Sequence, residues 1–258
     1  MALLEITNLS KHFGGLKAVD SVDLYVEKGE IVSIIGPNGA GKTTVFNLLT
    51  GVYDVTEGEI MLNNKPIHNK TPQETVIAGI SRTFQNIRLF REMRVIENVL
   101  VGTHIHTGYN FLDLVFRTSK YKRIEVEKTQ KAVDILEAIG LGDKIHDYAI
   151  NLPYGDQRRL EIARAIATNP EIILLDEPAA GMNPNESEEL LEFIKELRDK
   201  GYTIIMIEHD MNVVMKISDR IYVMDHGKRI AHGLPEEIAN NKLVIEAYLG
   251  KEEDDFDA

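Results

Sequence analysis

The chain has 258 residues, of which 43% are hydrophobic and 27% charged, a balance typical of a globular protein. Its 29 basic and 41 acidic residues give a net charge of −12, which disfavours binding to nucleic acid through phosphate neutralisation. Cysteine is absent, which excludes disulfides, thiolate nucleophiles and cysteine-ligated metals.

Nothing in the sequence predicts a segment that spans a membrane, because no apolar run reaches the ~18 residues that a bilayer requires. Residues 1–5 contain an acid and no base, unlike the start of a secretory signal. We therefore expect any association with a membrane to come through a partner.

The first part of the chain predicts antiparallel strands over 3–7, 19–26 and 59–62, with glycine-containing turns between them. Later strands look different. Three continuous apolar runs, typical of parallel strands buried on both faces, cover 32–35, 172–175 and 203–207. A helical spacing of apolar residues lies between the last two, so strand, helix and strand predict a βαβ unit and an α/β core.

The middle of the chain, from about residue 88 to 150, has a helical pattern with an apolar stripe from Val126 to Ile139 and Gly140 as its C-cap. The end is acidic, and without it the chain retains a net charge of −8. We assign that tail no function and expect it to be a solvated end. The prediction is a single domain over 1–258, with an α/β core (1–87 and 151–250), an inserted helical subdomain (88–150) and the acidic tail (251–258).

Residues 36–43, Gly-Pro-Asn-Gly-Ala-Gly-Lys-Thr, match the phosphate-loop motif G-x-x-x-x-G-K-[ST]. Glycines let several backbone N–H groups point at one anion, Lys42 supplies a positive charge for the β- and γ-phosphates, and the Thr43 hydroxyl is a ligand for Mg²⁺. A chance glycine-rich turn is the alternative, but a strand before the motif and a helix after it argue against that. The motif predicts a nucleoside triphosphate site formed by Asn38, Gly39, Ala40, Gly41, Lys42, Thr43 and Thr44.

Acidic and imidazole side chains follow two of the buried strands. Asp176 and Glu177 end one run, and His209 follows the next. Ligands collect at the carboxyl edge of such sheets, so we expect Asp176 to reach Mg²⁺ through water, Glu177 to position the attacking water and His209 to contact the γ-phosphate. An isolated acidic pair would more often be a solvated turn, and an isolated histidine a surface or core group. The phosphate loop favours the catalytic interpretation.

The ordered set of motifs resembles the nucleotide-binding domain of ABC transporters over essentially the whole chain. The resemblance implies a P-loop NTPase fold with a mixed sheet, an N-terminal antiparallel β subdomain and an inserted helical subdomain. It rests on Phe13 before the phosphate loop, Gln85 after a strand, Leu-Pro-Tyr-Gly-Asp-Gln at 152–157 before a helix, Asp176–Glu177 and His209.

The resemblance also implies roles at the matching positions. Phe13 would stack on adenine, although a core phenylalanine is the alternative, and Val19 would also contact the nucleotide. Gln85 would contact Mg²⁺ and the attacking water, and its loop would report to a membrane partner. Gly155 would act in trans on the γ-phosphate bound by a second subunit, with two ATP molecules held between two copies.

Several positions depart from the family pattern. Pro153 replaces the usual serine of the signature segment, Tyr154 and Asp156 replace a glycine and a glutamine, and Asn183 stands where aspartate is usual. Loss of the serine hydroxyl removes one charge-assisted donor, on the order of 1.5–3 kcal/mol. The same departures, with the string at 82–90, resemble the ATPases of branched-chain amino-acid importers; urea and amide importers share them.

We therefore expect an ATPase of an ABC importer that uses ATP and Mg²⁺ and forms a homodimer, or a heterodimer with a similar subunit. Its partners would be membrane permease subunits and, indirectly, a periplasmic-type binding protein, but no nucleic acid. It would lie peripherally on the cytoplasmic face of the membrane, with Ile87, Leu89 and Phe90 exposed towards the permease unless they pack locally. The alternatives are a cytosolic ABC ATPase without a transport role and a P-loop kinase.

Overall fold

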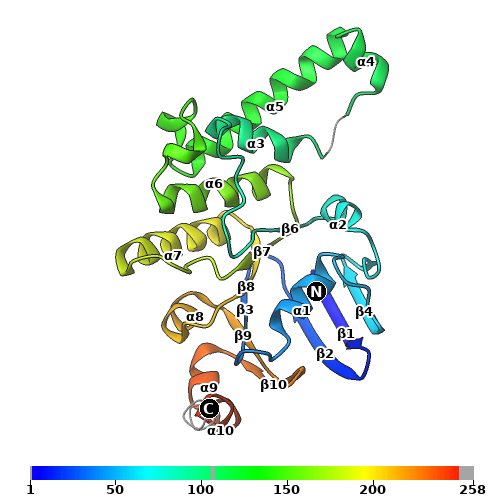
Figure 1. The fold of residues 1–258 in the computed structure, drawn as a ribbon, viewed down its shortest axis with the longest axis vertical. Helices are drawn as coiled ribbons and strands as arrows, with labels where there is room; N and C mark the ends of the chain where they lie inside the picture. Colours follow the sequence, from blue (N-terminus) through cyan, green and yellow to red (C-terminus); the bar gives the residue numbers. More distant parts are fainter. Residues whose placement is uncertain (1, 106–107, 250–258) are drawn as a thin grey trace.

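Two β-sheets form the centre of the structure, a computed structural model that describes residues 2–105 and 108–249 (Figure 1). The larger sheet is mixed. Its strands are parallel except for β10, which pairs antiparallel with β9. The order across this sheet is β10 (Lys228–Gly233), β9 (Arg220–Asp225), β3 (Ile31–Ile35), β8 (Thr203–Ile207), β7 (Ile172–Asp176) and β6 (Ile80–Arg82).

The smaller sheet is antiparallel, as the sequence predicted, and its strands are longer than expected. Its order is β2 (Leu16–Val26), β1 (Leu4–Phe13), β4 (Glu57–Leu62) and β5 (Lys65–Pro66). Apolar side chains of β1, β2 and β4 form one buried cluster with side chains of β3 and of the helix α1 (Lys42–Leu49). Burial between the two sheets therefore fixes the position of α1, which begins in the phosphate loop.

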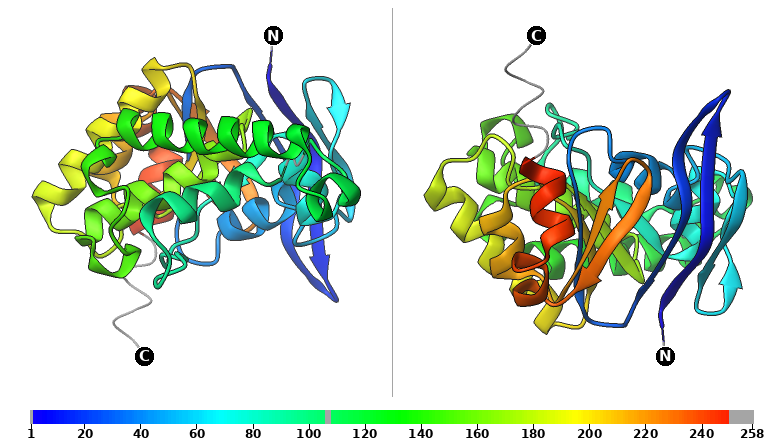
Figure 2. Two further views of the ribbon diagram at one scale, coloured as in Figure 1. Left: turned by 90° about the horizontal axis from the view of Figure 1, so that it is seen from above. Right: turned by 90° about the horizontal axis from the view of Figure 1, so that it is seen from below.

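Further helices cover the larger sheet. A second buried cluster joins β7 and β8 to α7 (Pro184–Asp199) and α8 (Met211–Ile217). The short helices α9 (Pro235–Ala239) and α10 (Lys242–Leu249) pack against β10, as Figure 2 shows, and α2 (Pro72–Ala78) precedes β6. The predicted acidic tail, 251–258, lies outside the described residues.

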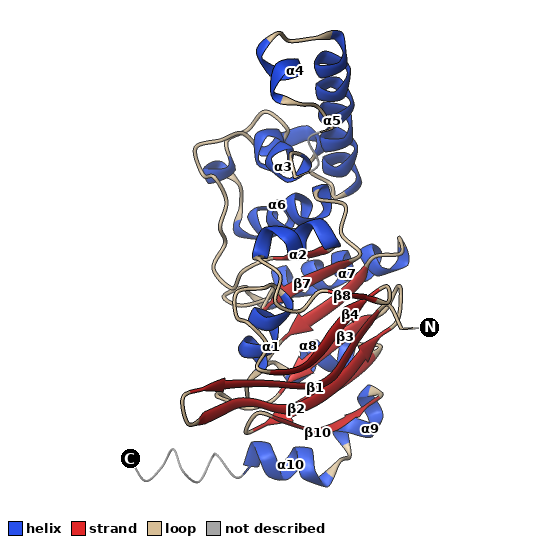
Figure 3. Cartoon of the chain, turned by 90° about the vertical axis from the view of Figure 1, so that its right-hand side faces the viewer, coloured by secondary structure: helices blue, strands red, loops and turns tan. Residues whose placement is uncertain are grey.

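The remaining helices gather at one end of the molecule (Figure 3). Val126, which the sequence placed in the apolar stripe of this region, is 69% exposed, so the buried stripe comprises Ala132, Leu136 and Ile139. None of the helices within 2–105 and 108–249 is both long and apolar enough to cross a bilayer. The helices here are α3 (Val95–Thr103), α4 (Phe111–Val115), α5 (Ser119–Ala138), η1 (Gly142–Lys144), η2 (Ala149–Asn151) and α6 (Tyr154–Ala167).

Candidate functional site

The site lies where four neighbouring strands end. The strands β3, β8, β7 and β6 are adjacent and parallel, so their carboxyl ends lie at one edge of the sheet. The phosphate loop follows β3, Asp176 ends β7, and His209 and Gln85 follow β8 and β6. Segments far apart in the sequence thus converge where parallel sheets usually bind their ligands.

The phosphate loop connects β3 to α1 through backbone conformations that favour glycine. Gly41 is the N-cap of α1 and has φ 99°. At Gly36, where φ is 147°, a Cβ atom would overlap the carbonyl oxygen of Met224. The Lys42 ammonium donates to the carbonyl oxygens of Gly36 (2.6 Å) and Pro37 (3.0 Å), which holds it against the loop.

A cavity of about 360 Å³ opens at this loop. Phe13 and Val19 are not among its lining residues. Phe13 is half-exposed and packs edge-on against Tyr53, with ring centroids 5.1 Å apart, and Val19 is fully buried in β2, so contact of either with adenine stays a prediction. The lining residues are Leu16, Lys17, Ala18, Asn38, Gly39, Ala40, Gly41, Lys42, Thr43, Thr44, Glu177, His226 and Gly227.

Glu177 is the point where the three predicted catalytic side chains meet. The Gln85 Nε2 atom donates to Glu177 Oε2 at 2.7 Å, and the same oxygen lies 3.6 Å from His209 Nδ1. The Glu177 backbone has φ 44°, an unfavourable value for a residue with a side chain, and its N–H donates to the carbonyl oxygen of Ile207 at 2.9 Å. The end of β8 therefore helps to hold Glu177 in its unusual conformation.

Asp176 makes a contact that the sequence did not indicate. Its carboxylate accepts from Arg82 at 2.6 Å, and Arg82 also donates to Asn47 of α1 at 2.7 Å. Arg82 thereby links β6, β7 and α1 around the predicted metal site. Within the described part of the chain no cluster of three histidine or acidic side chains is placed to hold a metal ion. The hydroxyl, carboxamide and carboxylate oxygens of Thr43, Gln85 and Asp176 suit Mg²⁺, which binds proteins through few carboxylates together with substrate phosphates.

The loop that carries Gln85, residues 83–90, is tied to α6 by a buried ion pair that the sequence analysis missed. Arg158 is fully buried and donates to the carbonyl oxygens of Phe84 (2.7 Å) and Gln85 (2.8 Å). It also donates to Glu161 at 2.9 Å, and the other carboxylate oxygen of Glu161 accepts from the N–H of Arg88. We call residues 83–90 the Gln85 loop.

The apolar residues of the Gln85 loop differ in exposure. Phe90 is 49% exposed, but Leu89 packs against the second core cluster and Ile87 is half-buried. Asn98 of α3 fixes the end of the loop, since it donates to the carbonyl oxygen of Phe90 and accepts from its N–H. Of the three side chains expected to face a partner, only Phe90 is exposed.

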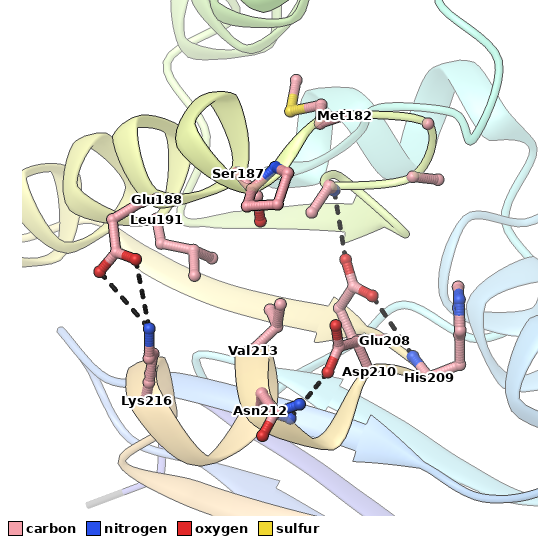
Figure 4. Close-up of a pocket in the computed structure, with 14 residues that line it drawn as sticks. Met182, Ser187, Glu188, Leu191, Glu208, His209, Asp210, Asn212, Val213 and Lys216 are labelled. Carbon is pink, nitrogen blue, oxygen red and sulfur yellow. Dashed lines mark hydrogen bonds and ion pairs between the residues drawn. The ribbon is translucent and has the colours of Figure 1, made fainter.

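A second cavity, of about 340 Å³, lies between α7, α8 and the loop after Glu177 (Figure 4). Glu208, 1% exposed, points into the space between that loop and His209, where it accepts from the N–H groups of Ala179 (3.2 Å) and His209 (3.3 Å). Burial raises the pKa of its carboxyl above the ordinary value of 4.5. Glu208 thus connects the segments that follow β7 and β8, a role that its place beside His209 in the sequence did not reveal.

Gly155 lies in the first turn of α6 and lines a different cavity from the phosphate loop. The N-cap of α6 is Pro153, and no side chain caps the helix. Tyr154 donates its hydroxyl to the carbonyl oxygen of Ala180, and Asn183 caps α7 by accepting from the N–H groups of Asn185 and Glu186. Tyr154 and Asn183, two of the residues that differ from the usual family pattern, thus each form hydrogen bonds within this subunit.

Known proteins are similar to this chain in sequence and in fold. Residues 19–180 match the model of the ABC transporter family, and residues 228–254 match a model described as branched-chain amino acid ATP-binding cassette transporter. The chain is 52% identical to the high-affinity branched-chain amino acid transport ATP-binding protein LivG of Salmonella typhimurium, over 96% of this chain and 98% of that one. It is 48% identical, with the same coverage, to the corresponding protein BraF of Pseudomonas aeruginosa.

Solved structures of ATP-binding cassettes have the same fold as this chain. The fold superposes with a TM-score of 0.85 on an ATP-binding cassette of an ABC transporter in its ADP conformation, which is 38% identical and is covered to 99% by 97% of this chain. The family match extends over more than half of the chain and includes the phosphate loop, the Gln85 loop, the first turn of α6 and Glu177. The chain therefore belongs to the ABC transporter family, as one of its ATP-binding, ATP-hydrolysing subunits.

Proposed function

We propose that this subunit powers an importer of branched-chain amino acids, by closing with a second ATP-binding subunit on two ATP molecules. The meeting of Gln85 and His209 at Glu177, beside the phosphate-loop cavity, is the observation that supports the catalytic arrangement. The match of residues 228–254 and the names of the relatives support the solute class.

Lys42 and the backbone N–H groups of the phosphate loop bind the phosphates in this proposal, while Phe13 and Val19 contact the adenosine part. Thr43 and Gln85 would hold Mg²⁺, and Asp176 would reach it through water; when bound, the ion would neutralise charge that develops on the phosphates. Glu177 orients a water molecule and accepts its proton as the water oxygen bonds to the γ-phosphorus. The bond from phosphorus to the β,γ-bridging oxygen breaks, ADP leaves with the electron pair, and His209 donates a hydrogen bond to the transferred group.

The second half of each ATP site comes from another subunit, either a second copy or a similar ATPase. The N-terminal turn of α6 supports this role for Gly155, because no side chain caps its N–H groups and the helix dipole favours an anion there. Pro153 has no hydroxyl, so backbone groups replace the missing serine in contacting the γ-phosphate.

The Gln85 loop and the helical end of the molecule transmit closure to membrane permease subunits, and Phe90 is the exposed apolar side chain of that loop. The subunit then works peripherally at the cytoplasmic face of the membrane, and a periplasmic-type binding protein delivers the solute to the permease. Nucleic acid has no part in this proposal.

Two substitutions test the site. In Glu177→Gln we expect ATP turnover to fall by about 10²–10⁴-fold, the range for loss of general-base catalysis, while ATP binding persists and a closed dimer accumulates. In Lys42→Ala we expect ATP binding itself to be lost. Turnover measured by phosphate release, binding measured by calorimetry and dimer content measured by light scattering distinguish the two. Glu192 and Lys28 are exposed and lie outside the site, so Glu192→Gln and Lys28→Ala serve as controls that make the same chemical changes elsewhere. Turnover by Glu177→Gln at the control rate would refute the assignment.

The solute is tested separately, with the subunit assembled on its permease in proteoliposomes. Leucine, isoleucine or valine bound to the binding protein should stimulate ATP turnover, whereas urea and short amides should not. Stimulation by urea or an amide alone would overturn the solute class and leave the ATPase assignment intact.

A further inference from the structure

The helix α4 exposes apolar side chains although it is well formed. Asn110 caps it, accepting from the N–H of Asp113 at 2.9 Å, and the Asp113 carboxylate accepts from the N–H of Asn110. Yet α4 buries none of its residues. The apolar side chains of α4 do not pack into a hydrophobic core, so burial on folding does not explain why they are apolar. The side chains that are 45–75% exposed are Phe111, Leu112, Leu114, Val115 and Phe116.

Contacts with α5 fix the position of α4. Asp113 accepts from the Thr118 hydroxyl at 2.8 Å and lies 3.7 Å from the ammonium of Lys120. Just before α4, Tyr109 packs edge-on against Tyr121, with ring centroids 5.0 Å apart, and donates to Glu125 at 3.0 Å. The polar side of α4 is thus held to α5, and its apolar side chains remain uncovered.

A basic stretch adjoins this apolar surface. Residues 117–123 contain four basic residues and no acidic one, in a chain whose net charge is −12. All four are exposed: Arg117, Lys120, Lys122 and Arg123. Residues 117–123 are therefore opposite in charge to the whole protein, and they lie next to phenylalanine and leucine side chains. Lys120 lies 3.7 Å from Asp113 and Arg123 3.8 Å from Glu127, so Arg117 and Lys122 are the basic groups of this stretch for which no ion pair is found among the described residues.

Both features lie at one extremity of the molecule. Figures 1 and 3 show α4 and the start of α5 at the end of the helical region, opposite α9 and α10 and beyond both sheets. In both views this end lies away from α1, the helix that begins in the phosphate loop.

We propose that α4 and the start of α5 bind directly to the surface of a bilayer that contains anionic lipids. Exposed aromatic and aliphatic side chains beside lysine and arginine are the composition of helices that lie in the membrane interface, with the apolar part inserted ~5–10 Å and the basic groups at the headgroups. A protein partner would have to offer an apolar surface bordered by acids; anionic lipid offers both features at once. This contact is additional to any contact with a permease, and it departs from the expectation from sequence that association with a membrane comes through a partner.

The experiment uses the full chain without a permease and measures its cosedimentation with vesicles. We expect binding to mixed phosphatidylglycerol–phosphatidylcholine vesicles, weak binding to phosphatidylcholine alone, and loss of the difference at about 1 M salt, where the Debye length falls to about 3 Å. Arg117→Asn with Lys122→Gln should weaken binding to the anionic vesicles by about 25-fold, at about fivefold for each charge. Asparagine is chosen at 117 because it tolerates the left-handed backbone (φ 43°) found there.

The apolar part is tested with Phe111→Ser/Phe116→Ser, which should lose binding to vesicles of either composition while ATP binding persists, because α4 buries nothing. The matched control Val52→Ser/Leu243→Ser removes two exposed apolar side chains elsewhere and should bind as the unaltered chain does.

Insertion has a direct readout, because the chain contains no tryptophan. Phe116→Trp should shift its emission to the blue on anionic vesicles and be quenched by lipids brominated on the acyl chain, whereas Leu243→Trp should not respond. Absence of vesicle binding, or equal binding by the Phe111→Ser/Phe116→Ser variant, would overturn the proposal. So would a chain that ignores vesicles but binds a detergent-solubilised permease through Phe111 and Phe116, since that result would make α4 a protein-docking surface.

Discussion

Replacing Arg158 with methionine tests the link between α6 and the Gln85 loop. The change removes a fully buried guanidinium that donates to Phe84, Gln85 and Glu161. It also removes the nearer cationic partner of the Glu161 carboxylate, which is 1% exposed, and leaves Arg164, 4.0 Å from its other oxygen, as the remaining one.

The size of the expected loss of stability follows from the burial of the Arg158–Glu161 ion pair. Breaking a buried ion pair by removing one partner lowers the free energy of unfolding by about 3–5 kcal/mol, because the remaining charge stays desolvated. Replacing both Arg158 and Glu161 with methionine removes that charge. The carbonyl groups of Phe84 and Gln85 lose Arg158 as a partner in both variants, so they do not distinguish them. In place of the charge penalty, the double variant loses the bond from the Arg88 N–H to Glu161, about 1–3 kcal/mol for that one group. The double variant should therefore be more stable than the single one.

Urea unfolding followed by circular dichroism gives the three stabilities, and phosphate release gives turnover. Both variants should have impaired turnover, because neither anchors the Gln85 loop, even though the double variant regains stability. If Arg158→Met lowers the free energy of unfolding by less than about 1 kcal/mol, or if the double variant is the less stable one, the Arg158–Glu161 pair does not hold the Gln85 loop.

Two further perturbations address the buried carboxylate and the phosphate loop. Burial raises the pKa of Glu208 above 4.5, so its stabilising contribution is present below pH 4.5 and is lost as pH rises through the raised pKa. The unfolding free energy of the unaltered chain minus that of Glu208→Gln should therefore fall with pH, measured by urea unfolding from pH 4 upwards; a difference that rises would contradict this. Gly36→Ala should abolish ATP binding and lower the free energy of unfolding by roughly 2 kcal/mol or more, because its Cβ would overlap Met224 and strain the backbone. Gly15→Ala, with no atom near its added Cβ, should stay within about 0.5 kcal/mol of the unaltered chain.

The sequence predicted the parts of the fold whose local pattern is unambiguous. The runs ending at Ile35, Leu175 and Ile207 are almost entirely apolar because parallel strands are buried on both faces, and the residues that follow them lie at one edge of the sheet. The phosphate loop was likewise predictable, since glycine, lysine and threonine each meet a separate requirement: a tight backbone turn, a positive charge for the phosphates and a hydroxyl ligand for Mg²⁺.

Contacts between distant segments were not predictable from one sequence. Arg82 and Asp176 are 94 positions apart, and Arg158 lies 73 positions from Gln85, so no spacing rule relates them. Helical periodicity also failed at Val126, because it identifies an apolar face without showing whether another element covers that face. For the same reason, the sequence does not show that one side of α4 is uncovered.

Attachment of the Gln85 loop to the helical end at Arg158 and Asn98, and to Glu177 through Gln85 itself, has a thermodynamic consequence. Any force that reorients these helices therefore also acts on the surroundings of Glu177, the carboxylate that we propose orients the attacking water. Coupling of this kind is reciprocal: a membrane component that favours one orientation of the helices by a given factor must find its own affinity altered by the same factor when nucleotide binds. Binding of nucleotide at the phosphate loop and the orientation of the helices at the other end of the subunit are thus linked in one equilibrium.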